Sequence, residues 1–443
     1  MKEEIIKNSS VENIIKSYSR FVPHQFIQLM GKDSVADIIL GDSLEKKMTI
    51  LFSDMRDFTT LSESMTPRQN FSFINSYLER MEPVISRYNG VIDKYIGDAI
   101  MALFPTSAND ALDCSIAMLN RLTGYNEERK KADYRPIGIG IGLNTGIMML
   151  GTIGGKERMD STVISDAVNL SSRIETMTKN YGVSLLISEH TYYSLDDASK
   201  YHIRFADRVR VKGKEQPQSI YEVFDADPPE QRAAKKNTIR IFERAIAYYY
   251  FKEVKGALEL FRQCMNECPE DRLAQFYVDR CERFLNTGIH EGTGEVDLSI
   301  EWSEDKEIGH PVIDDQHRQL FISTNEFVDA IKKDRNFSQA GSMIGFLDEY
   351  VRIHFKTEED IMETSGYPFL DLQKDQHERF TQYFANLKRE LEEDTDSDWH
   401  FLLFRIQVLV MDWLVHHTCK YDKHFGKFMR LQKIPDIRQE SIL

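Results

Sequence analysis

The chain is 443 residues long and carries a formal net charge of −15 at pH 7. This length exceeds what a single hydrophobic core usually supports, so we expect about two or three domains. The acidic excess excludes a surface that wraps nucleic acid or lies on anionic lipid, because both partners would be repelled. The first residues lack the basic start and apolar stretch of a secretory signal, and the five scattered cysteines contain no CxxC pair. We therefore expect a cytoplasmic protein with reduced cysteines.

The first region, from Met48 to Phe224, alternates short β-rich runs with long amphipathic segments. This alternation is typical of an α/β or α+β domain. Within it, Thr66 followed by a proline and by Gln69 predicts the start of a helix with a capping box. The apolar positions that follow are expected to face the core: Phe71, Ile74, Tyr77, Leu78 and Met81.

The longest uncharged run covers residues 136–155 and is rich in glycine. Its central Asn144-Thr145-Gly146 predicts two strands of a hairpin rather than a helix across a membrane. A Gly-Gly-Lys sequence ends the run, but Glu157 follows where a phosphate-binding loop needs Ser or Thr. We therefore expect no membrane span, and phosphate groups must be bound by other residues.

The rest of the chain reads as helical. Two consecutive prolines, at 228 and 229, end the first domain, and residues 238–286 resemble one tetratricopeptide-like helical hairpin, with a plain helical spacer as the alternative. Four long helical patterns after a Gly-rich stretch predict a four-helix bundle. The predicted segments are a helical lead-in at 1–44, an α+β domain at 45–225, a helical linker at 226–295 and an all-α bundle at 296–443.

Asp54 and Asp98 form the first candidate site. Asp54 ends a buried strand pattern, and Asp98 follows Gly97 in a turn between two more strand patterns. Strand ends can hold two carboxylates close together, and such a pair can share two Mg²⁺ or Mn²⁺ ions about 4 Å apart. The alternative is that both aspartates cap helices or form turns, which is their commoner role.

The neighbouring residues favour the metal interpretation, because three segments resemble the signature segments of class III nucleotidyl cyclases: Phe52–Thr59, Asp93–Asp98 and Thr162–Arg173. The resemblance covers about residues 20–224, including a lead-in at Arg20–Pro23. It implies a ferredoxin-like βαββαβ core, and it implies that Asp54 and Asp98 bind the two metals, with the Met55 backbone carbonyl as a further ligand.

The same resemblance implies which residues bind the nucleotide. Lys94 and Thr162 would read the base, and they favour ATP, because a guanine-selective relative would be expected to carry an acid and a cysteine there. Lys212 would hold the terminal phosphates.

Asn169 and Arg173 lie four residues apart in a helix that Ser165 is expected to cap, so they share one face. Ordinary surface polarity is one interpretation of this pair. The resemblance implies instead that Asn169 orients the ribose and that Arg173 stabilises charge on the α-phosphate. It further implies a head-to-tail homodimer that converts ATP to cyclic AMP and pyrophosphate, with each site shared between two chains.

The C-terminal bundle carries histidines and carboxylates at helical spacings. Segments around Trp302, Tyr367 and Trp413 resemble hemerythrin over about residues 300–430, which implies a non-haem di-iron centre. By this resemblance one iron is bound by two histidines, the other iron by two more, and two carboxylates bridge them: His317 and His354, His377 and His417, and Glu358 and Asp422.

Gln373 departs from this pattern, because the family has another histidine at that position. An amide oxygen is a weaker ligand for ferrous iron than imidazole, so the second iron is expected to have an exchangeable position. This favours a sensor of O₂, of another small ligand or of redox state over an oxygen carrier. The sequence therefore predicts an oxygen- or redox-regulated adenylate cyclase. The alternatives are an oxygen-binding or iron-storage protein with an inactive cyclase-like domain, and a cyclase whose bundle binds no metal.

Overall fold

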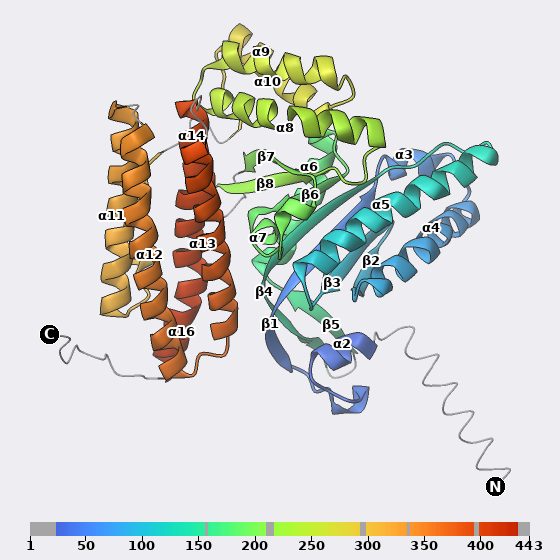
Figure 1. The fold of residues 1–443 in the computed structure, drawn as a ribbon. Coiled ribbons are helices and arrows are strands. Elements are labelled where there is room, and N and C mark those ends of the chain that lie inside the picture. The colour runs from blue at the N-terminus through green and yellow to red at the C-terminus, as the bar shows by residue number, and fades with distance from the viewer. Residues whose placement is uncertain are drawn as a thin grey trace. The chain divides into compact units, whose positions relative to one another are not determined.

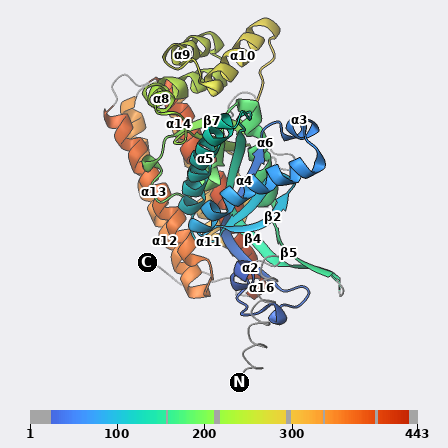
Figure 2. The same ribbon diagram turned by 90° about the vertical axis from the view of Figure 1, so that its right-hand side faces the viewer.

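The computed structural model describes residues 24–155, 158–209, 217–292, 298–334, 337–393 and 398–432. The described chain divides into two compact units, the first formed by the described part of Met1–Ile239 with Cys264–Tyr277, and the second by Arg240–Gln263 with the described residues from Val278 onward. Figures 1 and 2 show a mixed sheet with helices in the first unit and a helical bundle in the second. The predicted lead-in at Arg20–Pro23 lies outside the described residues.

Within its described residues, the first unit contains an eight-stranded sheet in the order β2-β3-β1-β4-β6-β8-β7, with β5 paired to β4. The pairings among β2, β3, β1 and β4 are antiparallel, whereas β4 pairs with β6 in parallel. Helices follow β1 and β3, so the predicted ferredoxin-like βαββαβ core is confirmed. The strands are β1 (Ser43–Met55), β2 (Val91–Ile96), β3 (Ala99–Phe104), β4 (Ile139–Gly155), β5 (Arg158–Ile164), β6 (Leu185–Ser188), β7 (Ile203–Val209) and β8 (Gln218–Val223).

The helices of this unit are α2 (His24–Leu29), α3 (Phe58–Glu63), α4 (Pro67–Arg87), α5 (Ala108–Lys131), α6 (Asp166–Tyr181) and α7 (Glu189–Tyr192). Thr66 caps α4 through the predicted capping box with Gln69. The predicted core face is wrong at Phe71, which is 73% exposed. The buried residues of α4 repeat every four positions instead: Phe73, Tyr77, Met81 and Ile85.

The glycine-rich run is one strand, β4, and the predicted hairpin turn within it is wrong. Asn144 lies in the middle of the β1–β4 ladder, where its buried side chain donates to the Ala167 carbonyl (2.9 Å) and accepts from Ser188 Oγ (2.7 Å). The glycines allow a helix to approach instead, because a Cβ on Gly142 would lie 2.3 Å from the backbone nitrogen of Glu175 in α6. The hairpin forms between β4 and β5.

A buried charge network joins the first helix after the sheet to the strands. Arg204 of β7 is fully buried and donates to both carboxylate oxygens of Asp271 (2.7 and 2.6 Å) and to Glu222 of β8 (2.6 Å). Lys235 of α8 (Pro229–Tyr250) donates to Glu222 and to Asp227, both at 2.7 Å. These contacts fix the beginning of α8, and the residue before α10 (Arg272–Thr287), to the sheet.

Asp271→Ala is expected to destabilise the first unit by about 3–5 kcal/mol, because it leaves the Arg204 guanidinium buried with one acid fewer. Urea unfolding followed by circular dichroism measures this loss. Lys179→Ala removes an exposed ion pair with Asp57 (2.8 Å) and serves as the control, with an expected cost below about 1 kcal/mol. Equal midpoints for both variants would contradict a structural role for the network.

The second unit contains the predicted four-helix bundle, formed by α11 (Pro311–Asp334), α12 (Phe337–Ser365), α13 (Leu370–Glu393) and a last long helix (Figure 1). The last helix is continuous from Trp399 to Gln432 through α14 (Trp399–Ile406), α15 (Asp412–His416) and α16 (Lys423–Gln432). Two π-helical segments interrupt its α-helical pattern, at Gln407–Met411 and His417–Asp422. The helix α9 (Val254–Glu267) lies between α8 and α10 in the chain.

Among the described residues, no helix combines the length and the apolar character that crossing a membrane requires.

Candidate functional site

Asp54 and Asp98 lie together where β1 ends and where the chain turns from β2 into β3. Asp54 is the penultimate residue of β1, and Asp98 lies in the turn between β2 and β3, where Gly97 has the positive φ of 66° that favours glycine. The pKa of Asp98 is raised to about 6 by burial, by the charge of Asp54 and by a hydrogen bond between the two side chains. Two neighbouring carboxylates that repel each other are a suitable pair of ligands for a divalent cation. Met55 ends β1, and its backbone N–H donates to Asp54 Oδ1 (3.0 Å).

Lys94 and Thr162 are brought together from two strands that are far apart in the sequence. Lys94 lies in β2, Thr162 lies in β5, and Lys94 Nζ is 3.4 Å from Thr162 Oγ1. Sequence reasoning missed Asp93, whose buried carboxylate lies 3.2 Å from the same ammonium group. The only signal for it was an acid next to a lysine expected to read the base.

Asn169 and Arg173 lie on α6 as predicted, and Ser165 caps this helix by accepting a hydrogen bond from the Ala167 backbone N–H (3.1 Å). Asn169 is exposed and Arg173 is half-buried, so both lie off the face that packs on the sheet. That position leaves Asn169 accessible to a ligand. Lys212 lies outside the described residues.

The six predicted iron ligands converge inside the bundle, and each is almost fully buried. Glu358 Oε1 lies 3.4 Å from His317 Nε2, while Glu358 Oε2 lies 3.6 Å from His354 Nε2 and 3.4 Å from His377 Nε2. Two overlapping groups of potential ligand atoms result, each within 4.8 Å: His317, His354 and Glu358, and Glu358, His377 and His417.

Asp422 is the second carboxylate that contacts both groups. Its Oδ2 lies 3.2 Å from His317 Nε2, and its Oδ1 lies 3.2 Å from His417 Nε2. His417 and Asp422 are five residues apart, a spacing that an ordinary α-helix places on different faces. The π-helical segment His417–Asp422 widens the turn and lets both side chains face the cluster.

Apart from these ion-pair contacts with one another, several buried atoms of the cluster have no hydrogen-bond partner among the described residues. They include Nε2 of His317, both carboxylate oxygens of Glu358 and Oδ2 of Asp422. Leaving a buried polar atom without a partner costs about 1–3 kcal/mol. Imidazole nitrogens and carboxylate oxygens, close together and unsatisfied, are the donor set of a metal centre.

Two residues that sequence reasoning missed orient the histidines. Glu359 Oε1 lies 2.8 Å from His377 Nδ1, and Gln316 Oε1 lies 3.1 Å from His354 Nδ1. Such contacts fix which ring nitrogen faces a metal. Each residue is a neighbour in sequence of a predicted ligand, and this adjacency was the only available signal.

Gln373 faces the cluster at the position where a histidine was expected. Its side chain is 1% exposed, and its Nε2 donates to Asp422 Oδ1 (3.1 Å). Its Oε1 has no hydrogen-bond partner among the described residues. Gln373 therefore contacts a predicted bridging carboxylate through its amide nitrogen.

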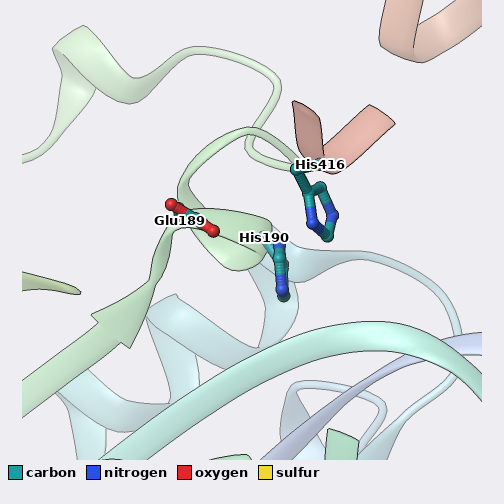
Figure 3. A group of neighbouring side chains, drawn as sticks. All are labelled: Glu189, His190 and His416. Atoms are coloured by element: carbon teal, nitrogen blue, oxygen red, sulfur yellow. The ribbon is translucent and has the colours of Figure 1, made fainter. Parts of the chain in front are cut away.

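Figure 3 shows Glu189 and His190 of α7. Each of them has a hydrogen-bond partner within the first unit. The Ser219 backbone N–H donates to Glu189 (3.0 Å), and Gln218 Nε2 lies 3.2 Å from His190 Nε2. His416, also drawn there, belongs to the second unit, so no site is inferred from the three.

Two family models match the chain. Residues 42–223 match the adenylate and guanylate cyclase catalytic domain, and residues 309–428 match the hemerythrin HHE cation binding domain. An adenylate cyclase of Anabaena cylindrica is 42% identical over 224 residues, which cover 49% of this chain and 45% of that protein. A terminal-differentiation specific adenylate cyclase of Dictyostelium discoideum is 34% identical over 283 residues, covering 62% and 13% respectively.

Among solved structures, the adenylyl cyclase CyaB from P. aeruginosa is 33% identical over 41% of this chain and 96% of that chain, with a TM-score of 0.37. The chain spans less than half the length of the two curated relatives.

Proposed function

We propose that this chain, which carries an adenylate and guanylate cyclase catalytic domain followed by a hemerythrin HHE domain, converts ATP to 3′,5′-cyclic AMP and pyrophosphate under the control of iron. The meeting of Asp54 with Asp98 supports the catalytic part most strongly. Two acids that repel each other at a strand end are costly unless a cation joins them. The convergence of six buried ligand residues in the bundle supports the regulatory part.

In this proposal each residue of the cyclase domain has a separate task. Asp54 and Asp98 hold two divalent cations, and the Met55 carbonyl is a further ligand. The cations would activate the ribose 3′-hydroxyl for in-line attack on the α-phosphorus and neutralise the departing pyrophosphate. Asn169 orients the ribose, and Arg173 stabilises the charge that develops on the α-phosphate. Lys212 holds the terminal phosphates.

The proposed enzyme is a head-to-tail homodimer, in which Asn169 and Arg173 of one chain reach the aspartates of the other. The accessibility of Asn169 supports this arrangement. Large apolar side chains on the β4–β5 hairpin that carries Thr162 are also exposed, between 37% and 60%: Met149, Ile153, Met159 and Ile164. Grouped exposed apolar side chains are typical of an interface.

The direct test incubates the purified full-length chain with Mg²⁺ or Mn²⁺ and ATP, and measures cyclic AMP and pyrophosphate by chromatography. Formation of both in equal amounts is expected. If neither appears under any metal condition, the catalytic proposal fails, and an oxygen-binding or iron-storage protein with an inactive cyclase-like domain becomes the better description.

Lys94→Glu combined with Thr162→Cys is expected to shift preference from ATP toward GTP. A lysine and a hydroxyl suit the acceptor and donor edge of adenine, whereas an acid suits the donors of guanine. The ratio of kcat/KM for the two nucleotides should change by about a hundredfold, because each base contact contributes about 1–3 kcal/mol. An unchanged ratio in a folded, active variant would contradict the base-reading role.

The regulatory proposal assigns His317 and His354 to one iron, His377 and His417 to the other, and Glu358 and Asp422 to both. Bound iron would supply a centre that changes valence with oxygen or cellular reductants. Gln373 donates to Asp422 through its amide and offers no imidazole, so a second iron held by His377 and His417 would leave room for an exchangeable ligand. This open position favours a sensor of oxygen or redox state.

The regulatory test measures cyclic AMP formation by one preparation in its diferrous, diferric and metal-free states. The rates are expected to differ, because a site shared between chains is sensitive to displacements of about 1 Å. Gln373→His, which adds a fifth imidazole to the cluster, should retain bound O₂ longer than the wild type. Equal rates in all three states would separate the bundle from catalysis, and cyclase activity would stand without regulation.

A further inference from the structure

Asp93 occupies a β-bulge beside the proposed base pocket. In the β2–β3 ladder Ile92 pairs with Ala102 and Lys94 pairs with Met101, so Asp93 is an extra residue without a partner in the ladder. A bulge of this kind re-aims the side chains next to it. In a regular strand the side chains of Asp93 and Lys94 would point to opposite faces. The bulge therefore allows two consecutive side chains to meet.

The two side chains of this contact differ in how far they are exposed to solvent. The Asp93 side chain is 1% exposed, whereas that of Lys94 is 38% exposed, and Asp93 Oδ2 lies 3.2 Å from Lys94 Nζ. Neither carboxylate oxygen of Asp93 has a hydrogen bond among the described residues. A buried carboxylate is costly unless a cation accompanies it, so Asp93 holds the ammonium group of Lys94 close.

The same ammonium group also contacts the second proposed base reader. Lys94 Nζ lies 3.4 Å from Thr162 Oγ1, so the lysine is placed between a buried acid and a hydroxyl. Burial raises the pKa of Asp93, the charge of Lys94 opposes this rise, and the charge of Asp160 adds to it. A free lysine side chain populates many rotamers. Because Asp93 already restricts the Lys94 side chain before the nucleotide binds, less conformational entropy is lost on binding.

We propose that Asp93 is a positioning residue that fixes Lys94 toward the nucleotide base and thereby determines the preference for adenine. This inference rests on the proposed adenylate cyclase function. It predicts that Asp93 acts only through Lys94, whereas a residue that merely fills the bulge would act on the stability of the sheet.

The test is a double-mutant cycle in the full-length chain with Asp93→Asn, Lys94→Gln and both together. Asp93→Asn keeps the shape of the side chain and removes its charge. It should lower kcat/KM for ATP by about tenfold, mainly through KM, and lower the ATP/GTP ratio by a similar factor, because the ion pair that holds the Lys94 ammonium group is lost. The double variant should be no worse than Lys94→Gln alone, because residues that act as a unit are not additive.

Asp133→Asn is the matched control, because Asp133 is exposed and has a positive φ of 61° that asparagine tolerates. This variant should leave both kcat/KM for ATP and the ATP/GTP ratio unchanged. Thermal midpoints of all variants show whether the fold is kept, and Asp93→Ser replaces Asp93→Asn if the amide prevents folding.

Additive losses in the cycle, or an unchanged ATP/GTP ratio in folded Asp93→Asn, would overturn the inference while leaving the cyclase function intact. If the wild-type chain forms no cyclic nucleotide, the proposed function fails, and binding of fluorescent ATP and GTP analogues in Ca²⁺ tests Asp93 separately. A weaker preference for the ATP analogue in Asp93→Asn, but not in Asp133→Asn, would support the positioning role. The same preference for the ATP analogue over the GTP analogue in the wild type, Asp93→Asn and Asp133→Asn would overturn the positioning role.

Discussion

Asp54→Ala and Asp98→Ala are each expected to lower cyclic AMP formation by about a thousandfold or more while leaving the chain folded. Lewis-acid stabilisation by bound metal contributes several kcal/mol to the transition state, and about 1.4 kcal/mol corresponds to a tenfold change in rate. Removing one of two shared carboxylates releases both cations, so both variants should lose activity to a similar extent. Initial rates at saturating Mg²⁺ and Mn²⁺ measure this loss.

The thermal stability of the aspartate variants shows whether they lose activity because they lose metal or because they unfold. The folded-state pKa of Asp98 is about 6, above its ordinary value of 3.8, because of burial and the charge of Asp54. The folded chain therefore binds the extra proton more tightly, and its metal-free stability falls as pH rises from about 4 through 6. Asp54→Ala removes the repulsion, so above pH 6 without metal this variant should melt at least as high as the wild type.

Glu79→Ala is the control for the aspartate variants, since Glu79 is exposed on α4. It should retain wild-type rates. Full turnover by either aspartate variant would contradict the two-metal assignment. A lower melting temperature of Asp54→Ala above pH 6 would instead indicate that the pair stabilises the fold.

Glu358→Ala is expected to remove most of the iron from the purified chain. Glu358 contacts three of the four histidines, so its loss breaks the bridge between both groups. Iron per chain, measured by elemental analysis after purification, should fall from about two to well below one. Added Fe²⁺ should raise the melting temperature of the wild type and should not raise that of the variant, because only bound metal stabilises the folded state.

Two further variants on α12 are expected to lose less iron than Glu358→Ala. Glu359→Ala removes the contact with His377 Nδ1 and should lower iron affinity by about 10–100-fold without abolishing binding. Glu349→Ala changes an exposed residue of the same helix and should retain full iron content. If Glu358→Ala purifies with the iron content of the wild type, the bundle does not use this cluster as its metal centre.

The sequence by itself determined those features that depend on residues close together in the chain. The capping box joins Thr66 and Gln69, three positions apart, and Ser165 caps α6 through an amide two residues away. The strand pattern before Asp54 and the turn after Gly97 placed both aspartates at strand ends. Antiparallel pairing of β1 with β3 then makes these ends neighbours.

The tertiary structure alone decided features whose cause lies far away in the sequence. Asn144 forms no turn, because partners 23 and 44 residues away satisfy its side chain within a strand. The bulge that brings Asp93 to Lys94 depends on the register of β2 against β3, and the convergence of His417 with Asp422 depends on a π-helical segment. Short-range propensity fixes where elements begin and end, but register and helical pitch follow from packing against the rest of the chain.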